Sequence, residues 1–275
     1  MKYGKRIVSH VILLLFVGLM FMPLYLALIA ASKEGGALMH SSLSLIPGTA
    51  LFTNLKTVLI DGIAATGGEP VARMLFNSFW MAIFITIGKI FLALTSAFAL
   101  VYFDFPFKKI CFILIFATMM LPVEVRIVPT FQLIASFNLL NSFTGLTLPL
   151  LASATGTFLF RQFFKTIPKE LVDAAKLDGA GPVRFFWDIV LPLSRPQIAA
   201  LFVILFVYGW NQYLWPLLIT TETKMATIVM GIRYLAGVGD QVPEWHYIMT
   251  IALIALIPPC MVVLFMQRWF ERGLK

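Results

Sequence analysis

Side chains that could carry out chemistry are few in this sequence and isolated from one another. The three histidines, His10, His40 and His246, stand far apart, and neither a nucleophile–base grouping nor a metal-ligand spacing is present. The phosphate-binding pattern G-x-x-x-x-G-K-[ST] does not occur, so the chain has no P-loop for ATP. We therefore predict that the chain is not an enzyme by itself, with no catalytic or metal site.

Two basic residues, Arg126 and Lys89, interrupt long apolar stretches. A charge at the centre of a membrane helix costs about 2.5–3.5 kcal/mol, so Arg126 is a candidate for a substrate pathway, especially for a phosphate-bearing cargo. The alternative, which we favour, is a structural or gating role, with Glu124 and Arg126 paired to neighbours or placed at the outer end of a helix. Pro122 and Pro129 bracket them, so a break is expected there. For Lys89 we expect a structural role, by snorkelling or by pairing across the bundle.

Polar and aromatic side chains gather near the end of a later apolar stretch. They are Trp210, Asn211, Gln212, Tyr213 and Trp215. Aromatic rings and amides suit a polyol, although Trp and Tyr also anchor helices at membrane interfaces. Because Asn211 and Gln212 would be costly facing lipid, we predict that Trp210, Asn211, Gln212 and Tyr213 line a substrate pathway.

Residues 164–196 carry the signals of two short helices. Pro168 suits the first position of a helix, and Glu170 then lies in its positive first turn. Gly179 stands where a C-terminal cap glycine belongs, and Pro182 can open a second helix. We predict a helix–turn–helix at the membrane surface.

The two predicted helices differ in their side chains. Leu171, Ala174 and Ala175 share one face of the first helix, and the alanines would let the backbone of a partner approach closely. The second helix carries aromatic and aliphatic side chains that could pack against the membrane domain: Val183, Phe186, Trp187 and Ile189. The pattern alone leaves two readings nearly even, a docking site for a partner or a surface loop that packs only on its own chain.

Composition and apolar runs indicate the elements that must position these residues. Of 275 residues, 60% are hydrophobic and 12% charged, and the mean hydropathy is +0.92, which a soluble domain cannot bury. Six stretches have the roughly 20 apolar residues that a membrane helix needs. We predict one all-α polytopic membrane domain over 1–275, with a turn at Asn138, Asn141 and Gly145. The predicted spans are about 8–31, 74–101, 110–135, 143–163, 197–219 and 247–267, with 164–196 as a cytoplasmic loop.

The distribution of basic residues predicts an orientation and excludes a nucleic-acid partner. The net charge is +8, but the Lys and Arg residues stand in short clusters beside the apolar runs. With the N-terminus inside, 14 of the 21 would be cytoplasmic and 5 would face outward. We expect six spans with both termini cytoplasmic.

The loop carries a specific resemblance. Asp173-Ala174-Ala175, Gly179, Ile189 and Leu191-Pro192 resemble the EAA signature of permeases of ATP-binding-cassette (ABC) importers, with Asp173 in place of the family's leading Glu. In that family this segment is the coupling helix that docks on the ATPase. The resemblance therefore implies a set of docking residues: Glu170, Asp173, Ala174, Ala175, Asp178, Gly179 and Pro182.

The likeness extends along most of the chain. Residues 120–126, 158–164 and 208–217 are similar to carbohydrate-type permeases related to the maltose importer, and most similar to those for glycerol phosphate. This implies the type I importer fold in a bacterial inner membrane, with sn-glycerol-3-phosphate or glycerophosphodiesters as cargo. The implied partners are a paralogous permease, two ATPase copies that hold ATP and Mg, and a periplasmic binding protein reached by the loop 220–246. A neutral sugar or oligosaccharide is the alternative cargo, and an ion-driven secondary transporter the alternative class.

Overall fold

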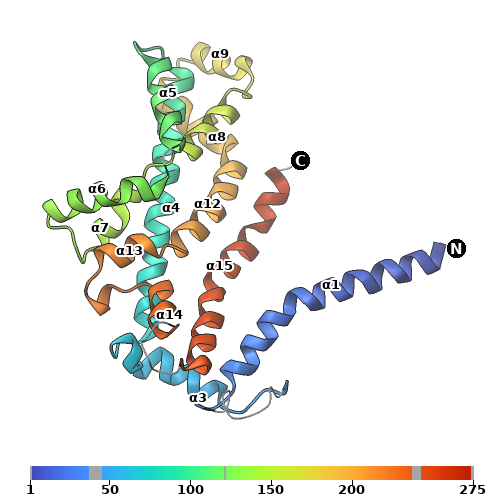
Figure 1. The fold of residues 1–275 in the computed structure, drawn as a ribbon. Coiled ribbons are helices and arrows are strands. Elements are labelled where there is room, and N and C mark those ends of the chain that lie inside the picture. Colours follow the sequence, from blue (N-terminus) through green and yellow to red (C-terminus); the bar gives the residue numbers. More distant parts are fainter. Residues whose placement is uncertain (1, 37–44, 121, 237–242, 274–275) are drawn as a thin grey trace. The chain divides into compact units, whose positions relative to one another are not determined.

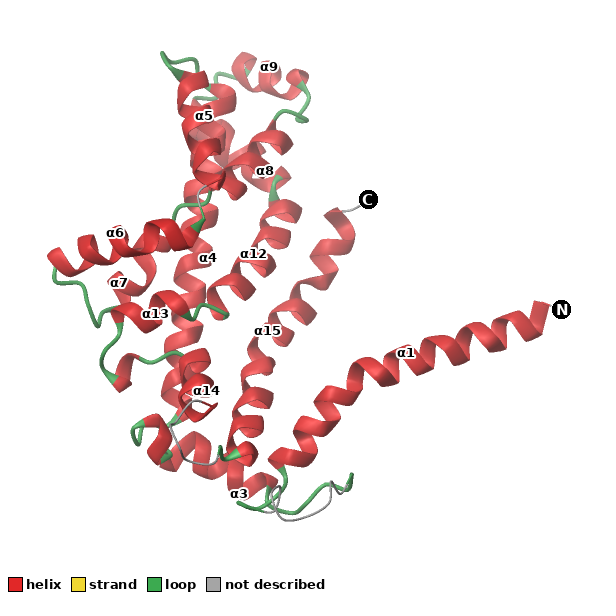
Figure 2. Cartoon of the chain, in the orientation of Figure 1, coloured by secondary structure: helices red, strands yellow, loops and turns green. Residues whose placement is uncertain are grey.

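The computed structural model describes residues 2–36, 45–120, 122–236 and 243–273, and every regular element in these ranges is a helix (Figures 1 and 2). Three helices are single, long and apolar enough to cross a membrane: α1 (Lys2–Ala31), α4 (Val71–Tyr102) and α15 (Trp245–Gly273). The shorter α-helices are α3 (Leu51–Lys56), α5 (Lys108–Ala117), α6 (Val123–Ser136), α7 (Phe143–Thr147), α8 (Ala154–Phe164), α9 (Lys169–Leu177), α10 (Pro182–Phe185), α11 (Leu191–Leu193), α12 (Arg195–Trp210), α13 (Leu214–Ile219) and α14 (Ile228–Ala236).

Short 3₁₀ and π turns join several of these helices. The 3₁₀ turns are Ala64–Thr66, Thr118–Met120, Leu148–Leu150 and Thr223–Met225, and the π turns are Thr57–Asp61 and Phe186–Val190. The chain forms two compact units, one from residues 1–76 and 226–257 and the other from 77–225 and 258–275.

The first unit is held together at the end of α1. The Asn54 side chain from α3 donates to the carbonyls of Ala31 and Lys33, at 2.9 Å each, and the Gly48 amide donates to the Ser32 hydroxyl at 2.7 Å. The rest of α1 is an apolar helix with exposed side chains from Ile7 to Tyr25. Such a surface suits a segment that lipid or another membrane chain surrounds.

The second unit contains two apolar clusters. One includes Met81, Ile85, Leu146, Trp215 and Ile219 and joins α4, α7 and α13. The other joins α4 to the segment from α8 to α12, and its buried members are Ile90, Ala93, Leu94, Ala97, Phe98, Phe160, Phe164, Ile167, Ala175, Phe185, Val190, Leu201 and Leu205.

Close backbone approaches bring α4 against its neighbours in this unit. A Cβ on Gly209 of α12 would stand 2.9 Å from the Cα of Ala82, and one on Gly156 of α8 would stand 2.9 Å from the Cβ of Ala93. These glycines therefore allow α8 and α12 to pack directly on α4.

Three of the predicted continuous spans are broken in the structure. The stretch 110–135 divides into α5 and α6 around Pro122, and 143–163 divides into α7 and α8, where the Ser153 hydroxyl accepts from the Gly156 amide and starts α8. The stretch 197–219 divides after Trp210. The expected turn is present at Asn138 and Asn141, which both have positive φ, at 54° and 53°, but Gly145 lies inside α7 and not in the turn.

Broken helices can still cross a membrane as pairs. In three places, two helices joined at a bend are together long and apolar enough to cross a membrane. These pairs are Lys108–Met120 with Val125–Ser136, Phe143–Leu150 with Ala154–Phe164, and Pro182–Leu193 with Arg195–Trp210. Three single helices and three bent pairs give up to six candidate spans by length and composition, which is the predicted number. The third pair differs from the predicted span 197–219, because it begins at Pro182, inside the predicted loop 164–196, and ends at Trp210.

Candidate functional site

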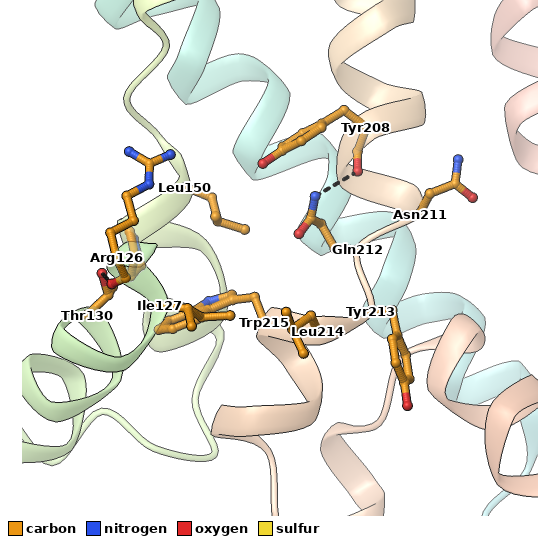
Figure 3. Close-up of a pocket in the computed structure, with 11 residues that line it drawn as sticks. Arg126, Ile127, Thr130, Leu150, Tyr208, Asn211, Gln212, Tyr213, Leu214 and Trp215 are labelled. Atoms are coloured by element: carbon orange, nitrogen blue, oxygen red, sulfur yellow. Dashed lines mark hydrogen bonds between the residues drawn. The ribbon is translucent and has the colours of Figure 1, made fainter. Parts of the chain in front are cut away.

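A polar cavity of about 410 Å³ lies within the second unit, between α6, the end of α12 and the start of α13 (Figure 3). This volume is within the range of roughly 300–1,000 Å³ that small-molecule sites occupy. Its lining residues are Arg126, Ile127, Thr130, Pro149, Leu150, Tyr208, Asn211, Gln212, Tyr213, Leu214 and Trp215. The cavity therefore combines a cation, two amides and two phenols with an apolar floor.

Three residues without helical structure separate α12 from α13 and supply the amides. The Asn211 side chain donates back to the Val207 carbonyl at 3.0 Å. The Gln212 side chain donates to the Tyr208 carbonyl at 3.2 Å, as Figure 3 shows. The Gln212 bond satisfies the Tyr208 carbonyl in the last turn of α12, whereas the Val207 carbonyl also accepts from the Asn211 backbone amide at 3.1 Å. Figure 3 shows the Gln212 side chain beside Tyr208 on the side of Arg126, whereas the Asn211 side chain points away from Arg126.

Arg126 reaches the cavity from α6, across from Tyr208 and Gln212 (Figure 3). Its side chain is exposed, and no ion pair joins it to a carboxylate among the side chains that the structure describes. The alternative of a pair with Glu124 concerns a side chain outside the described set. In the described part, the guanidinium is available to a ligand.

The cavity floor is fixed by Trp215 of α13. Its indole N–H donates to the Gly145 carbonyl of α7 at 3.2 Å, and the ring is only 4% exposed. Gly145 has no room for a side chain, because a Cβ there would collide with the Leu139 carbonyl. This packing holds α7 and α13 beneath the polar groups.

Four of the five residues predicted for the substrate pathway meet at this cavity: Arg126, Asn211, Gln212 and Tyr213. Trp210 does not line it, since its ring is 2% exposed and stacks on Phe206 with centroids 5.9 Å apart. Sequence reasoning missed Tyr208 and Thr130. The spacing of Tyr208, one helical turn before Gln212, is the signal that could have found it.

The predicted docking segment forms a helix–turn–helix. Pro168 precedes α9 as its N-cap instead of occupying the first helical position, and Glu170 lies in the first turn. Gly179 has φ +70°, its amide donates to the Lys176 carbonyl at 3.1 Å, and the Ala180 amide donates to the Ala175 carbonyl at 2.9 Å. This is a Schellman cap, which requires the left-handed residue that Gly179 provides.

The predicted docking residues divide between two faces of this segment. Glu170, Asp173, Ala174, Asp178, Gly179 and Pro182 are exposed, whereas Ala175 is 5% exposed and packs inward. Asp173 lies 3.9 Å from Lys176 in a solvated contact. Beside them, Leu177 is 89% and Val183 72% exposed, so the outer face carries uncovered apolar groups.

Phe185 anchors the segment to the membrane helices. It is 7% exposed, and its ring contacts Tyr102 edge-on with centroids 5.0 Å apart and Phe98 at 6.1 Å. The Tyr102 hydroxyl donates to the Phe164 carbonyl at 3.2 Å. The expected aromatic contact therefore forms through Phe185 and the half-buried Phe186, while Trp187 stays 60% exposed.

One helix joins the docking segment to the cavity. α12 starts at Arg195, directly after α11, and ends at Trp210, where the residues that line the cavity begin. Figure 1 shows α9 and α13 beyond its opposite ends. At 1.5 Å per residue, its 16 residues span about 24 Å.

Comparison with known proteins identifies the class of this arrangement. Residues 89–275 match the family described as "Binding-protein-dependent transport system inner membrane component". The chain belongs to this family. It is therefore an inner-membrane, multi-pass permease component of a binding-protein-dependent ABC transporter, and not a catalytic subunit.

Relatives resemble the chain over its whole length. It is 53% identical over 273 residues to the sn-glycerol-3-phosphate transport system permease protein UgpE of Yersinia pestis bv. Antiqua (strain Antiqua), covering 99% of this chain and 97% of that protein. The proteins of the same name from Yersinia enterocolitica serotype O:8 / biotype 1B and Salmonella typhi are 54% and 52% identical, with the same coverage. The predicted family resemblance is confirmed.

A solved structure has the same fold. A chain in the crystal structure of a bacterial ABC transporter involved in the import of the acidic polysaccharide alginate aligns with a TM-score of 0.82 and 19% identity. The alignment covers 98% of this chain and 97% of that one. This confirms the predicted all-helical importer-permease fold.

Proposed function

We propose that this permease forms half of a pore that imports sn-glycerol-3-phosphate, with Arg126 beside the cargo path and α9 as the docking helix for an ATPase. The observation that carries the cargo assignment is the identity of 52–54% to glycerol-3-phosphate permeases over nearly the whole chain. Glycerophosphodiesters carry the same two chemical groups, a phosphate and hydroxyls, and belong to the same proposal.

The chemistry of the cavity supports this cargo. The planar guanidinium of Arg126 can bind two phosphate oxygens at once, which strengthens and orients the contact. The amide of Gln212 and the phenol of Tyr208, which lie across from Arg126 in Figure 3, can bond the glycerol hydroxyls. The floor around Trp215 and Leu150 lets the carbon chain pass without binding it tightly.

The docking segment supports coupling to ATP hydrolysis. Its exposed outer face, with Leu177 and Val183, suits a partner protein better than water, and Phe185 fixes its inner face to α4. A movement of this segment would be carried by α12 to Asn211–Tyr213, which would change the width of the cavity. The ATPase would thereby open and close the pathway.

The proposal includes the subunits that such a pore needs. A paralogous permease would supply the other half, two ATPase copies would hold ATP and Mg, and a periplasmic protein would deliver the cargo. This chain would bind no cofactor of its own. We also propose that both termini are cytoplasmic, on the basis of the Lys and Arg bias.

The test is uptake of radiolabelled sn-glycerol-3-phosphate in cells that lack the native permease and carry this chain with its partner subunits. Arg126→Gln should reduce uptake about tenfold or more, as expected for the loss of one charge-assisted phosphate contact, and Arg126→Lys should retain part of it. Lys56→Gln, which removes an exposed cation of α3 outside the cavity and outside the loop 220–246, is the control and should be neutral.

Other outcomes distinguish the alternatives. Uptake of maltose-like sugars without glycerol phosphate would replace the cargo by a neutral sugar. Uptake that survives ATP depletion and collapses with a proton ionophore would replace the mechanism by ion-driven transport. Full uptake by Arg126→Gln would remove Arg126 from the cargo path.

A further inference from the structure

A second cavity, of about 480 Å³, lies in the second unit between the end of α4, the start of α5 and the end of α8. Its lining has three basic residues, one acidic residue and three apolar residues: Leu100, Asp104, Lys108, Lys109, Phe112, Ile113 and Arg161. None of these residues lines the polar cavity around Arg126. The second cavity is therefore a separate feature.

The second cavity has an excess of positive charge. Asp104 lies 3.3 Å from Lys108, which also donates to the Phe103 carbonyl at 2.7 Å. Lys109 and Arg161 form no ion pair within the described residues, so two cations are not neutralised. The first turn of α5 adds the positive end of its dipole and has no acidic residue. An anion would relieve this repulsion.

Arg161 is held in place for such an anion. Its guanidinium carbon lies 3.9 Å from the centroid of the Phe112 ring, which fixes the side chain against α5. Its Nε atom is buried and has no hydrogen-bond partner in the part of the chain that the structure describes. Because this Nε atom is buried, a phosphate in the cavity would meet the guanidinium through its terminal N–H groups.

The surroundings indicate which phosphate compound would bind. Ile110, Ile113 and Leu114 on α5 are 52%, 62% and 62% exposed, next to the basic groups. This face belongs to an apolar segment that we expect in the membrane, at the end where the basic residues predict the cytoplasmic side. A ligand here would meet cations at its head and apolar side chains along its length.

We propose that this cavity binds the headgroup of an anionic phospholipid, such as phosphatidylglycerol, from the cytoplasmic leaflet. The phosphate lies between Lys109 and Arg161, and an acyl chain runs along Ile113 and Leu114. Basic pockets between membrane helices at this depth are known to select such lipids. Asp104 also lines a neighbouring cavity of about 650 Å³ under α9, so the lipid would stabilise the end of α4 on which the docking segment packs.

The test uses the assembled importer in nanodiscs of phosphatidylcholine, with or without phosphatidylglycerol, and native mass spectrometry to count retained lipids. The wild type should retain phosphatidylglycerol. Arg161→Gln and Lys109→Gln should each lower that retention about fivefold, the change expected for one basic residue at an anionic surface. Arg195→Gln, an exposed arginine predicted on the same side, is the control and should leave retention unchanged.

Each remaining outcome overturns the proposal. Equal retention in all variants, or an equal loss in Arg195→Gln, would mean that the cavity selects no lipid. Release of the lipid by free inorganic phosphate at moderate concentration would assign the site to a soluble anion. Because Lys109 is exposed, its variant tests the proposal even if Arg161→Gln fails to fold.

Discussion

The ammonium nitrogen of Lys89 lies 4.2 Å from the centroid of the Tyr208 ring. Lys89 belongs to α4 and is only 8% exposed, whereas Tyr208 belongs to α12 and lines the polar cavity. The face of an aromatic ring attracts a cation, so the contact compensates a charge that is costly to bury. It joins the two helices beside the cavity, in agreement with the structural role that we predicted for Lys89.

If this contact stabilises the protein, substitutions of Tyr208 that remove the aromatic ring should lower the stability and those that keep it should not. Tyr208→Leu should destabilise the purified importer by about 2 kcal/mol, because the buried ammonium loses the ring, and Tyr208→Phe should be nearly neutral. Thermal unfolding of both variants measures the difference. In the Lys89→Met background the same Leu substitution should cost less, and strictly additive losses would show that the two side chains do not interact.

The positive φ of Gly179 leads to a second prediction, about the stability of the α9 cap and about coupling to the ATPase. At φ +70° any other residue is strained, so Gly179→Ala should cost about 1 kcal/mol in the α9 cap, and Gly179→Asn less. Gly179→Trp adds bulk at the proposed docking face and should uncouple ATPase activity from uptake. Gly181→Ala is the control, since Gly181 has φ −67° and open space around it. Equal effects at both glycines would contradict the strain argument.

If the buried ring of Phe185 holds the predicted docking segment against α4, removing the ring should release the segment. Phe185→Ala removes a buried ring and should cost about 3–5 kcal/mol locally. The segment should then open, so trypsin should cleave after Lys176 faster and less ATPase should copurify. Phe91→Ala removes a ring that is 63% exposed and should change neither result. A cleavage rate equal to that of the wild type would mean that other contacts hold the segment.

The close approach of α4 and α12 at Gly209 leads to a prediction about whether a side chain is tolerated there. A Cβ at this position meets the backbone of Ala82, which cannot rotate away, so Gly209→Ala should lower stability by about 1–3 kcal/mol. Gly18→Ala in α1 has no atom within 4 Å and should be neutral or stabilising by up to about 1 kcal/mol. Thermal unfolding of the two variants should therefore move in different directions.

Local backbone chemistry made much of the fold predictable. Gly179, Asn138 and Asn141 mark turns because few other residues accept positive φ, and the structure has positive φ at all three. Pro182 opens α10 because a missing amide costs nothing at that position. Apolar length likewise predicted α1, α4 and α15, the three single helices that are long and apolar enough to cross a membrane.

Features that depend on tertiary contacts were not predictable. The stretch 197–219 is uniformly apolar apart from a few amides, so hydropathy cannot reveal that the helix stops at Trp210. The sequence also could not choose among Phe185, Phe186 and Trp187, because a π turn from Phe186 changes which side faces α4. Trp210 belongs to the polar and aromatic group that the sequence placed at the substrate pathway, but its ring packs on Phe206 and does not line the cavity.

The length of α12 limits how members of this family can diverge. A residue inserted anywhere between Arg195 and Trp210 would advance the far end by 1.5 Å and rotate it by about 100°. Gln212 would then turn away from Arg126, although neither end had itself been mutated. Surface loops can gain or lose residues, but α12 has to keep its number of residues if the proposed docking segment and the proposed cargo site are to stay in register.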